Sequence, residues 1–156
     1  MTERRKPSLF VRALHLWFLL SRGLTLGVRG AVIDAEGRVL LIRHTYVKGW
    51  HLPGGGVERG ETALDALTRE LAEEANVEMT GPPILHGIAH NGHVSRRDHV
   101  LVYEVRAFRQ SAPKQPDREI AEAAFFPLDA LPEGTTAGTR ARLAEIEAGR
   151  ATAARW

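Results

Sequence analysis

The stretch LPGGGVERGETALDALTRELAEEANV, residues 52–77, decides the fold because it sets a glycine-rich loop directly before an uninterrupted helix. Residues 62–75 contain neither glycine nor proline. Gly60 or Thr62 can cap the N-terminus of this helix, and the acidic Glu61 suits the positive end of its dipole. We therefore predict a helix that begins near residues 61–62 and ends near Ala75.

Two stripes of side chains run along this predicted helix. Residues three and four apart share one face, so an apolar stripe is expected to face the core. Its members are Leu64, Leu67, Leu71 and Ala75. A neighbouring stripe is acidic and consists of Glu70, Glu73 and Glu74.

The acidic stripe has two interpretations. Like charges at these spacings repel by roughly 0.2–0.5 kcal/mol per pair, and only Arg69, four residues before Glu73, offers nearby relief. A solvated acidic face is the common interpretation for an arbitrary helix. A set of hard oxygen ligands for Mg²⁺ or Mn²⁺ is the other, and the helix alone does not decide between them.

The spacing around the helix resembles a known family signature. Gly55 is followed after five residues by Glu61, and then after seven residues by RELAEEANV, residues 69–77. This pattern closely resembles the Nudix box, and only the last glycine of the box differs, being Asn76 here. We expect Asn76 to end the helix in the left-handed conformation, which asparagine tolerates best after glycine.

The resemblance implies both a fold and a chemistry. The fold is an α/β/α sandwich with a mixed β-sheet, which agrees with the interleaving of expected strands and helices along the chain. The chemistry is hydrolysis of a phosphoanhydride bond in a nucleoside diphosphate linked to another moiety. Mg²⁺ or Mn²⁺ would bridge the carboxylates to the phosphates and acidify the attacking water.

The resemblance also implies roles for individual residues. Glu70 and Glu74 are the first metal ligands, Glu73 is the third, and the carbonyl of Gly54 is a further ligand. Glu61 and Arg69 are expected to pair and to hold the loop against the helix. The expected catalytic set consists of Glu73, Glu70, Arg69 and Glu61.

The general base and the substrate contacts lie outside the strict signature. The base is a box glutamate or an acid of a later loop, for which Glu119 and Glu122 are the candidates; simple surface acids are the alternative. The residues expected to contact substrate are Arg43, His44, Trp50 and Glu119. Arg43, His44 and Lys48 are positioned to meet phosphates, while Trp50 and Tyr46 either stack on a base or pack in the core. Four histidines, at positions 86, 90, 93 and 99, do not form the paired motifs of a zinc site.

Several further elements follow from turn residues and apolar runs. Residues 24–33 and 38–43 flank the turn Asp34–Gly37 and are expected to form a hairpin. Further strands are expected at 50–52, 84–90, 99–108 and 121–126. A last helix is expected over residues 139–148, with Leu143 and Ile146 facing inward and Gly149 as its stop.

Residues 1–22 are expected to form an extension ahead of a Nudix domain spanning residues 23–156. Phe10, Leu14, Trp17 and Ser21 lie at helical spacing, which predicts an amphipathic helix. Packing against the domain body or a second subunit is the main expectation. Contact with a membrane surface, aided by basic residues at positions 4–6, is the alternative. The apolar run is too short to span a bilayer.

Composition is that of one globular domain. The chain has 156 residues, of which 44% are hydrophobic and 26% charged, with a net charge of +2. This charge does not favour a stable nucleic-acid partner, and the absence of cysteine fits a cytoplasmic location. The expected partner is a nucleotide-type small molecule, and a homodimer stays open.

Two other functions remain open at this point. One is a nucleotide-sensing Nudix-like module without catalysis, although three mutually repelling acids are hard to explain in a pure binder. The other is a pyrophosphohydrolase that acts on RNA 5′ ends, which the lack of a basic stripe disfavours. The substrate itself is not specified: ADP-ribose, nucleoside triphosphates, dinucleoside polyphosphates and sugar nucleotides all fit.

Overall fold

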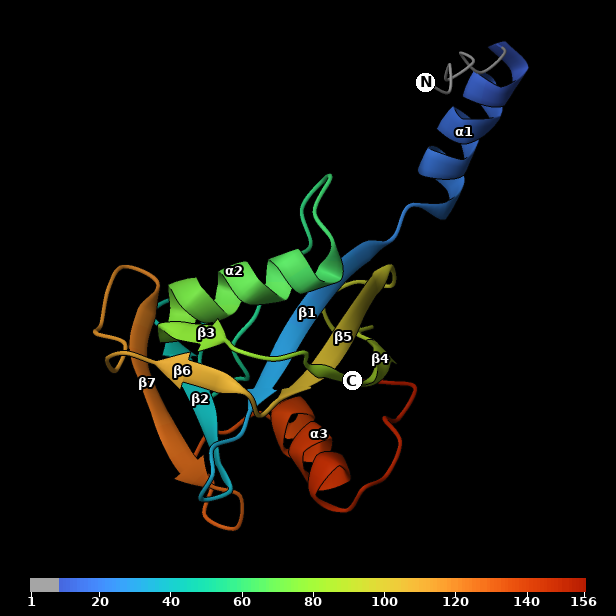
Figure 1. The fold of residues 1–156 in the computed structure, drawn as a ribbon. Helices are drawn as coiled ribbons and strands as arrows, with labels where there is room; N and C mark the ends of the chain where they lie inside the picture. The colour runs from blue at the N-terminus through green and yellow to red at the C-terminus, as the bar shows by residue number, and fades with distance from the viewer. Residues whose placement is uncertain (1–8) are drawn as a thin grey trace.

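The computed structural model describes residues 9–156 and has the mixed α/β architecture expected from the sequence (Figure 1). In the larger sheet, β1 (Thr25–Val32) runs parallel to β5 (Asp98–Val105), and β4 (Ile84–His90) runs antiparallel to β5. In a second sheet, β2 (Arg38–His44) pairs antiparallel with β7 (Ile120–Pro127). The short strands β3 (Val77–Met79) and β6 (Phe108–Gln110) form a third pair. The helices are α1 (Leu9–Arg22), α2 (Ala63–Ala75) and α3 (Ala137–Glu147).

The expected hairpin between β1 and β2 is wrong. The turn itself is present, with Gly37 at φ 78°, but only Ile33 and Val39 pair across it. The glycine loop occupies the edge of β1 instead: the N–H of Val28 donates to Gly55 O, and that of Gly30 to Pro53 O, both at 2.8 Å. The strands β1 and β2 are consecutive in the sequence, but each pairs with a strand that is distant in the sequence.

Helices cover opposite faces of the larger sheet, as the α/β/α expectation requires. Side chains alternate along β1, so that Val28 and Val32 pack with α2 while Ala31 and Ile33 pack on the side of Leu143 in α3. Gly30 has no side chain, and a Cβ at this position would lie 3.0 Å from Leu71. The missing side chain allows α2 to approach β1 closely, which fixes the height of its carboxylates above the glycine loop.

The ends of α2 form as expected, but its buried face is rotated. Thr62 caps the N-terminus in a capping box with Asp65, and Asn76 ends the helix in the left-handed region at φ 52°. Leu64, expected in the core, is 47% exposed, whereas Glu74 is only 7% exposed. The buried residues of the helix are Ala66, Leu67, Leu71, Glu74 and Ala75. A charged residue therefore takes a place among them.

The later elements differ from expectation mainly at their ends. The strand expected over residues 99–108 is divided into β5 and β6, and the last helix begins two residues early, after its cap Thr136. An ion pair that the sequence did not indicate anchors α3: Arg142 and Glu145 are 2.6 Å apart, with side chains 2% and 10% exposed. Glu145 also contacts His86 of β4 at 3.3 Å. This buried network ties the last helix to the sheet.

Helix α1 is present but does not pack on the domain body. It extends away from the sheets (Figure 1), and Leu16, Trp17 and Leu20 are 58%, 55% and 71% exposed. The expectation of packing against the body is therefore wrong, while contact with a second subunit stays a prediction. The side chain of Phe10 and the basic residues 4–6 lie outside the described residues. Over residues 9–156, no helix has the length and apolar character needed to cross a membrane.

Candidate active site

Two glycines allow the loop after Leu52 to lie directly against β1 and α2. Gly54 has φ 140°, a conformation that favours glycine, and a Cβ at this position would overlap the carbonyl oxygen of Val28. A Cβ at Gly55 would overlap the carboxylate of Glu70. The loop therefore forms a close cradle for a carboxylate from α2, which a larger residue at either position would obstruct.

Glu74 is the buried acid of the site. Its Oε2 accepts a hydrogen bond of 2.7 Å from the N–H of Gly54. Burial, aided by the nearby charges of Glu70 and Glu119, raises the pKa of Glu74 to about 7. The Gly54 N–H and the positive charge of Arg29 oppose this rise without cancelling it. The ionised carboxylate thus lacks sufficient positive charge around it, which is the condition that a bound cation relieves.

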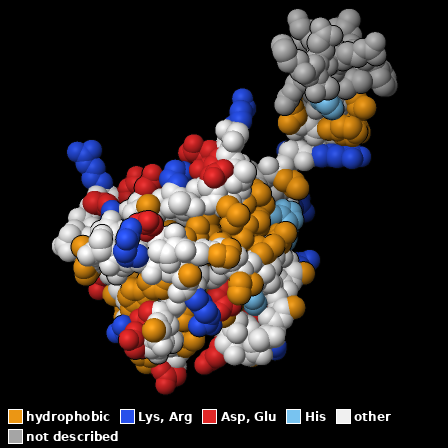
Figure 2. Space-filling view, in the orientation of Figure 1, with side chains coloured by type: hydrophobic (Ala, Val, Ile, Leu, Met, Phe, Trp, Pro, Cys, Tyr) orange, Lys and Arg blue, Asp and Glu red, His pale blue; other side chains and the backbone are white. Residues whose placement is uncertain are grey.

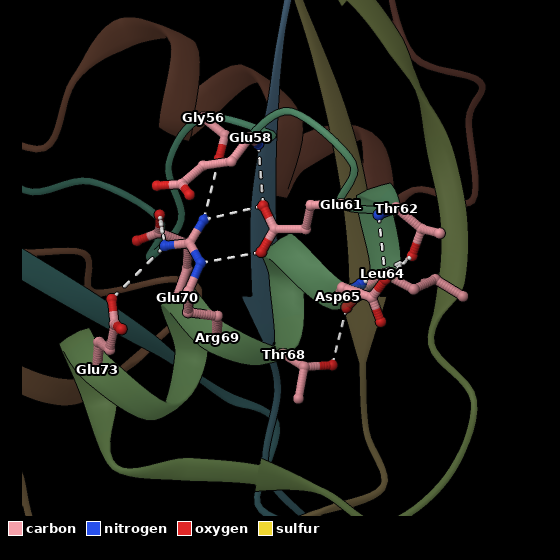
Figure 3. A network of polar contacts seen from close by, with 10 residues as sticks. All are labelled: Gly56, Glu58, Glu61, Thr62, Leu64, Asp65, Thr68, Arg69, Glu70 and Glu73. Carbon is pink, nitrogen blue, oxygen red and sulfur yellow. Dashed lines mark hydrogen bonds and ion pairs between the residues drawn. The ribbon is translucent and has the colours of Figure 1, made fainter.

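Arg69 links the loop, the helix and two carboxylates (Figure 3), as the sequence predicted for its pairing with Glu61. Its Nε donates to Glu61 Oε1 at 2.9 Å, and its Nη2 donates to Gly56 O at 3.1 Å. Its Nη1 donates to Glu70 Oε1 at 2.7 Å. These partners raise the pKa of Arg69 and lower that of Glu61, so both groups stay charged. The planar guanidinium reaches all three partners at once, which an ammonium cannot do.

Replacing Arg69 by lysine is expected to lower activity by about 10- to 100-fold while the protein stays folded, because the loop and Glu70 lose their shared donor. The rate of phosphoanhydride hydrolysis and the thermal midpoint measure the two effects. Arg109→Lys is the matched control, since Arg109 pairs only with Glu78 and both side chains are more than 60% exposed. Equal activities of the two variants would contradict the role of Arg69.

The three candidate metal ligands do not converge in this structure. Glu70 and Glu74 face the glycine loop, but Glu73 is turned toward Arg69 at 3.5 Å and its side chain is 62% exposed. Among residues 9–156 no group of three or more acidic, histidine or cysteine side chains is arranged to hold a metal ion. The carbonyl of Gly54 accepts a hydrogen bond of 2.5 Å from Arg29. The hard oxygen donors that Mg²⁺ or Mn²⁺ prefers are thus present on one helix turn, with two against the loop.

Arg29 and His51 are site residues that the sequence analysis missed. Arg29 lies in the middle of β1, and its Nη1 donates to the carbonyls of Leu52 and Gly54. His51 lies 5.7 Å from the ring of His44, and burial lowers its pKa. One clue was available for Arg29, since it is the only charged residue in the strand TLGVRGAV. Nothing in the local sequence distinguished His51.

His44 occupies the wall of the site beside Glu74. Its Nε2 lies 3.8 Å from Glu74 Oε1, and its side chain is 9% exposed. Burial lowers the pKa of His44, and the charge of Arg29 lowers it further. We therefore interpret the ring as neutral at pH 7, so its contact with Glu74 is not an ion pair there. Its Nδ1 is buried without a hydrogen-bond partner.

The other expected substrate contacts are divided between two sides of β2. Arg43 points to the side opposite His44 and pairs with Glu122 at 2.9 Å, as alternation along a strand requires. Its guanidinium lies 5.7 Å from the ring of Trp50, which is 8% exposed and packs on Phe126 in the core. Trp50 thus packs in the core, one of the two alternatives considered for it, and substrate contact by Arg43 stays a prediction.

Glu119 lies on the side of the site, unlike Glu122. Its backbone carbonyl accepts a hydrogen bond of 2.9 Å from Thr45, next to His44. Its charge raises the pKa of both Glu74 and Tyr46. The role of Glu119 as the general base stays a prediction.

Comparisons with known proteins agree with this geometry. The chain matches the NUDIX domain over residues 23–146. The human 8-oxo-dGDP phosphatase NUDT18 is 30% identical over 124 residues, which cover 78% of this chain and 38% of the human protein. A MutT NUDIX hydrolase from Burkholderia pseudomallei has a similar structure, with a TM-score of 0.68, 26% identity, and coverage of 78% and 97% of the two chains. An ADP-ribose pyrophosphatase from Streptococcus suis gives a TM-score of 0.61 at 26% identity, with coverage of 83% and 94%.

An α/β/α fold in which a helix presents glutamates to a glycine loop defines a Nudix-type domain. The match extends over all three sheets and α2, well beyond the box itself. This chain belongs to the Nudix hydrolase family. It spans between 38% and 51% of the length of the three curated relatives that match most of it.

Proposed function

We propose that this protein hydrolyses a phosphoanhydride bond in a nucleoside diphosphate linked to another moiety. The observation that carries the proposal is Glu74, a buried acid with a pKa near 7 that faces the glycine loop beside Arg29 and His44. An unbalanced acid next to a fixed positive charge suits a site that receives a cation together with a polyanion. The relatives named as a nucleotide phosphatase and an ADP-ribose pyrophosphatase support this substrate class.

Nudix hydrolases generally use divalent metal ions, and we propose Mg²⁺ or Mn²⁺ for this chain. Glu70 and Glu74 would hold the ion, joined by Glu73 once its side chain turns away from Arg69. When bound, such an ion neutralises phosphate charge and makes a nearby water more acidic. Two observations support this choice of metal. The donors are carboxylates, which hard cations prefer, and the burial of Glu74 is not compensated by the positive charge around it.

The remaining residues of the site have roles that follow from their charge and position. Arg29 supplies a permanent positive charge that attracts the phosphates of the substrate. His44, neutral at pH 7, can donate a hydrogen bond without competing with a cation. Glu119, directly before β7, can accept the proton that the attacking water loses. The Arg69–Glu61 pair keeps the loop and Glu70 in position before the substrate arrives.

Replacing Glu119 by glutamine is expected to lower the rate by about 10²- to 10⁴-fold, the range for loss of a general base. Glu122→Gln is the matched control: the same substitution three residues further along, on a side chain that pairs with Arg43. The ratio of the two rates at saturating substrate is the measurement. A larger loss in the Glu122 variant, or none in either, would transfer the role to a glutamate of the box.

A panel of substrates tests the function itself. ADP-ribose, nucleoside triphosphates, oxidised nucleoside diphosphates, dinucleoside polyphosphates, sugar nucleotides and triphosphorylated RNA would be incubated with Mg²⁺ or Mn²⁺, and the release of phosphate or nucleoside monophosphate measured. We expect turnover of at least one nucleotide, abolished by EDTA and restored by excess metal. Tight binding without turnover across the panel would favour a nucleotide-sensing module, and selective turnover of RNA would favour the RNA enzyme.

A further inference from the structure

The described part of α1 has an apolar face that no other described residue covers. Leu16, Trp17 and Leu20 lie on this face at helical spacing, and each is more than half exposed. His15 and Arg22 lie beside Phe18 and Leu19, and the guanidinium of Arg22 is 4.6 Å from the Phe18 ring and 5.9 Å from the Trp17 ring. Figure 2 shows the apolar side chains of α1 standing apart from the domain body. Exposed Trp and Leu side chains with basic groups beside them are typical of helices that lie in a membrane interface.

A second element adds to this surface at the base of α1. The loop between β4 and β5 carries Val94, which is 76% exposed, followed by Arg96 and Arg97. Arg97 lies beside the junction of α1 and β1, with its Nη1 3.6 Å from the Cβ position of Gly23 and its carbonyl accepting from Thr25. Leu24, in the same junction, is 68% exposed. Apolar and basic side chains thus meet at the end of the molecule from which α1 extends.

Charge complementarity distinguishes between a lipid surface and a second copy of the chain. Residues 1–23 contain a single acid, Glu3, against five basic residues: Arg4, Arg5, Lys6, Arg12 and Arg22. Pairing two such segments would bring like charges together around the apolar faces. An anionic lipid surface would instead attract each basic residue near it by about 1 kcal/mol.

We propose that α1, together with the tip of the β4–β5 loop, binds the surface of an anionic membrane. The helix has 14 residues and is thus about 21 Å long, shorter than the roughly 30 Å hydrocarbon core, so it lies along the interface. Leu16, Trp17 and Leu20 enter the boundary between headgroups and acyl chains. Arg22, Arg96 and Arg97 meet the lipid phosphates. This inference is independent of the proposed catalytic function.

Vesicle binding by the full chain tests the proposal. The chain would be sedimented with vesicles of phosphatidylcholine alone and with vesicles that also contain about 30% phosphatidylglycerol, which makes their surface anionic. We expect at least tenfold stronger binding to the anionic vesicles, weakened by salt, and a blue shift of Trp17 fluorescence that Trp17→Phe removes. Leu20→Glu should abolish binding and leave nucleotide hydrolysis unchanged. Ile84→Glu is the matched control, because Ile84 is 64% exposed on the domain body. This variant should bind vesicles as the unaltered chain does.

Three results would overturn the proposal. One is equal binding to neutral and anionic vesicles, or none to either. Another is anionic binding that Leu20→Glu leaves intact. The third is a stable dimer in sedimentation velocity that Leu20→Glu converts to monomer, without vesicle binding, which would assign the apolar face to a second copy of the chain.

Discussion

Glu74→Gln is expected to reduce nucleotide hydrolysis by about 100-fold or more, because metal-assisted stabilisation of the reacting phosphate contributes several kcal/mol. Glutamine still accepts the hydrogen bond from the Gly54 N–H, so the loop keeps its place while the charge is lost. Initial rates across a range of Mg²⁺ and Mn²⁺ concentrations measure the effect. A variant that keeps full activity would remove Glu74 from the cation site.

The same substitution is expected to stabilise the metal-free protein at alkaline pH. Because the folded pKa of Glu74 is raised from 4.5 to about 7, the folded state binds more protons than the unfolded state between these values. The free energy of unfolding contributed by Glu74 therefore falls as pH rises through this window and stays low above pH 7. Removing the charge should restore on the order of 2–3 kcal/mol at pH 8 and almost nothing at pH 4.

Urea unfolding in EDTA at these two pH values measures the stability difference. Glu73→Gln is the matched control, since Glu73 lies on the same helix with a side chain 62% exposed and should change stability little at either pH. A Glu74→Gln variant no more stable than the unaltered chain at pH 8 would show that Glu74 is not destabilised by burial.

Alanine substitutions at the three consecutive loop glycines are expected to have three different results. Gly54→Ala should destabilise the protein by about 2–5 kcal/mol, because the new Cβ overlaps backbone of β1 and the residue has φ 140°. Gly55→Ala should fold but lose most of its activity, because its Cβ displaces the end of the flexible Glu70 side chain. Gly56→Ala should be close to neutral in both respects, since no atom lies within 4 Å of a Cβ there.

Thermal unfolding and hydrolysis rates of the three variants separate these outcomes, with Gly56→Ala as the internal control. If Gly55→Ala were as unstable as Gly54→Ala, the loop would be fixed by its own backbone and not by the fit of Glu70. If all three kept full activity, the close approach of loop and carboxylate would have no catalytic role.

Features held within a few residues of one another were predictable from the sequence. The cap at Thr62, the left-handed Asn76 and the pairing of Glu61 with Arg69 all depend on local spacing along one loop and one helix. The regular rise and rotation of an α-helix accounts for the predicted ends of α2, while the pairing of Glu61 with Arg69 was implied by the resemblance. The resemblance then extended this local pattern to the whole fold.

Features that depend on distant strands were not predictable in the same way. The predicted pairing of β1 with β2 does not form because residues 53–56 occupy the edge of β1. No local sequence pattern indicates that these residues compete for this edge. Arg43 and His44 were expected to act together, but adjacent residues of a strand point to opposite faces, and an irregularity in pairing lies between them. Arg29 was missed because the sequence of its strand does not indicate that its side chain contacts the glycine loop.

The division of the strands into separate sheets has a consequence for how the site is held together. Arg29 belongs to the half of the molecule built on β1 and β5, and His44 to the half built on β2 and β7. The two halves are joined by one tight turn, the glycine loop, α2 and two shared hydrophobic clusters, so the packing between them sets the space between these two side chains. A molecule that contacts both side chains would add a further link between the two halves.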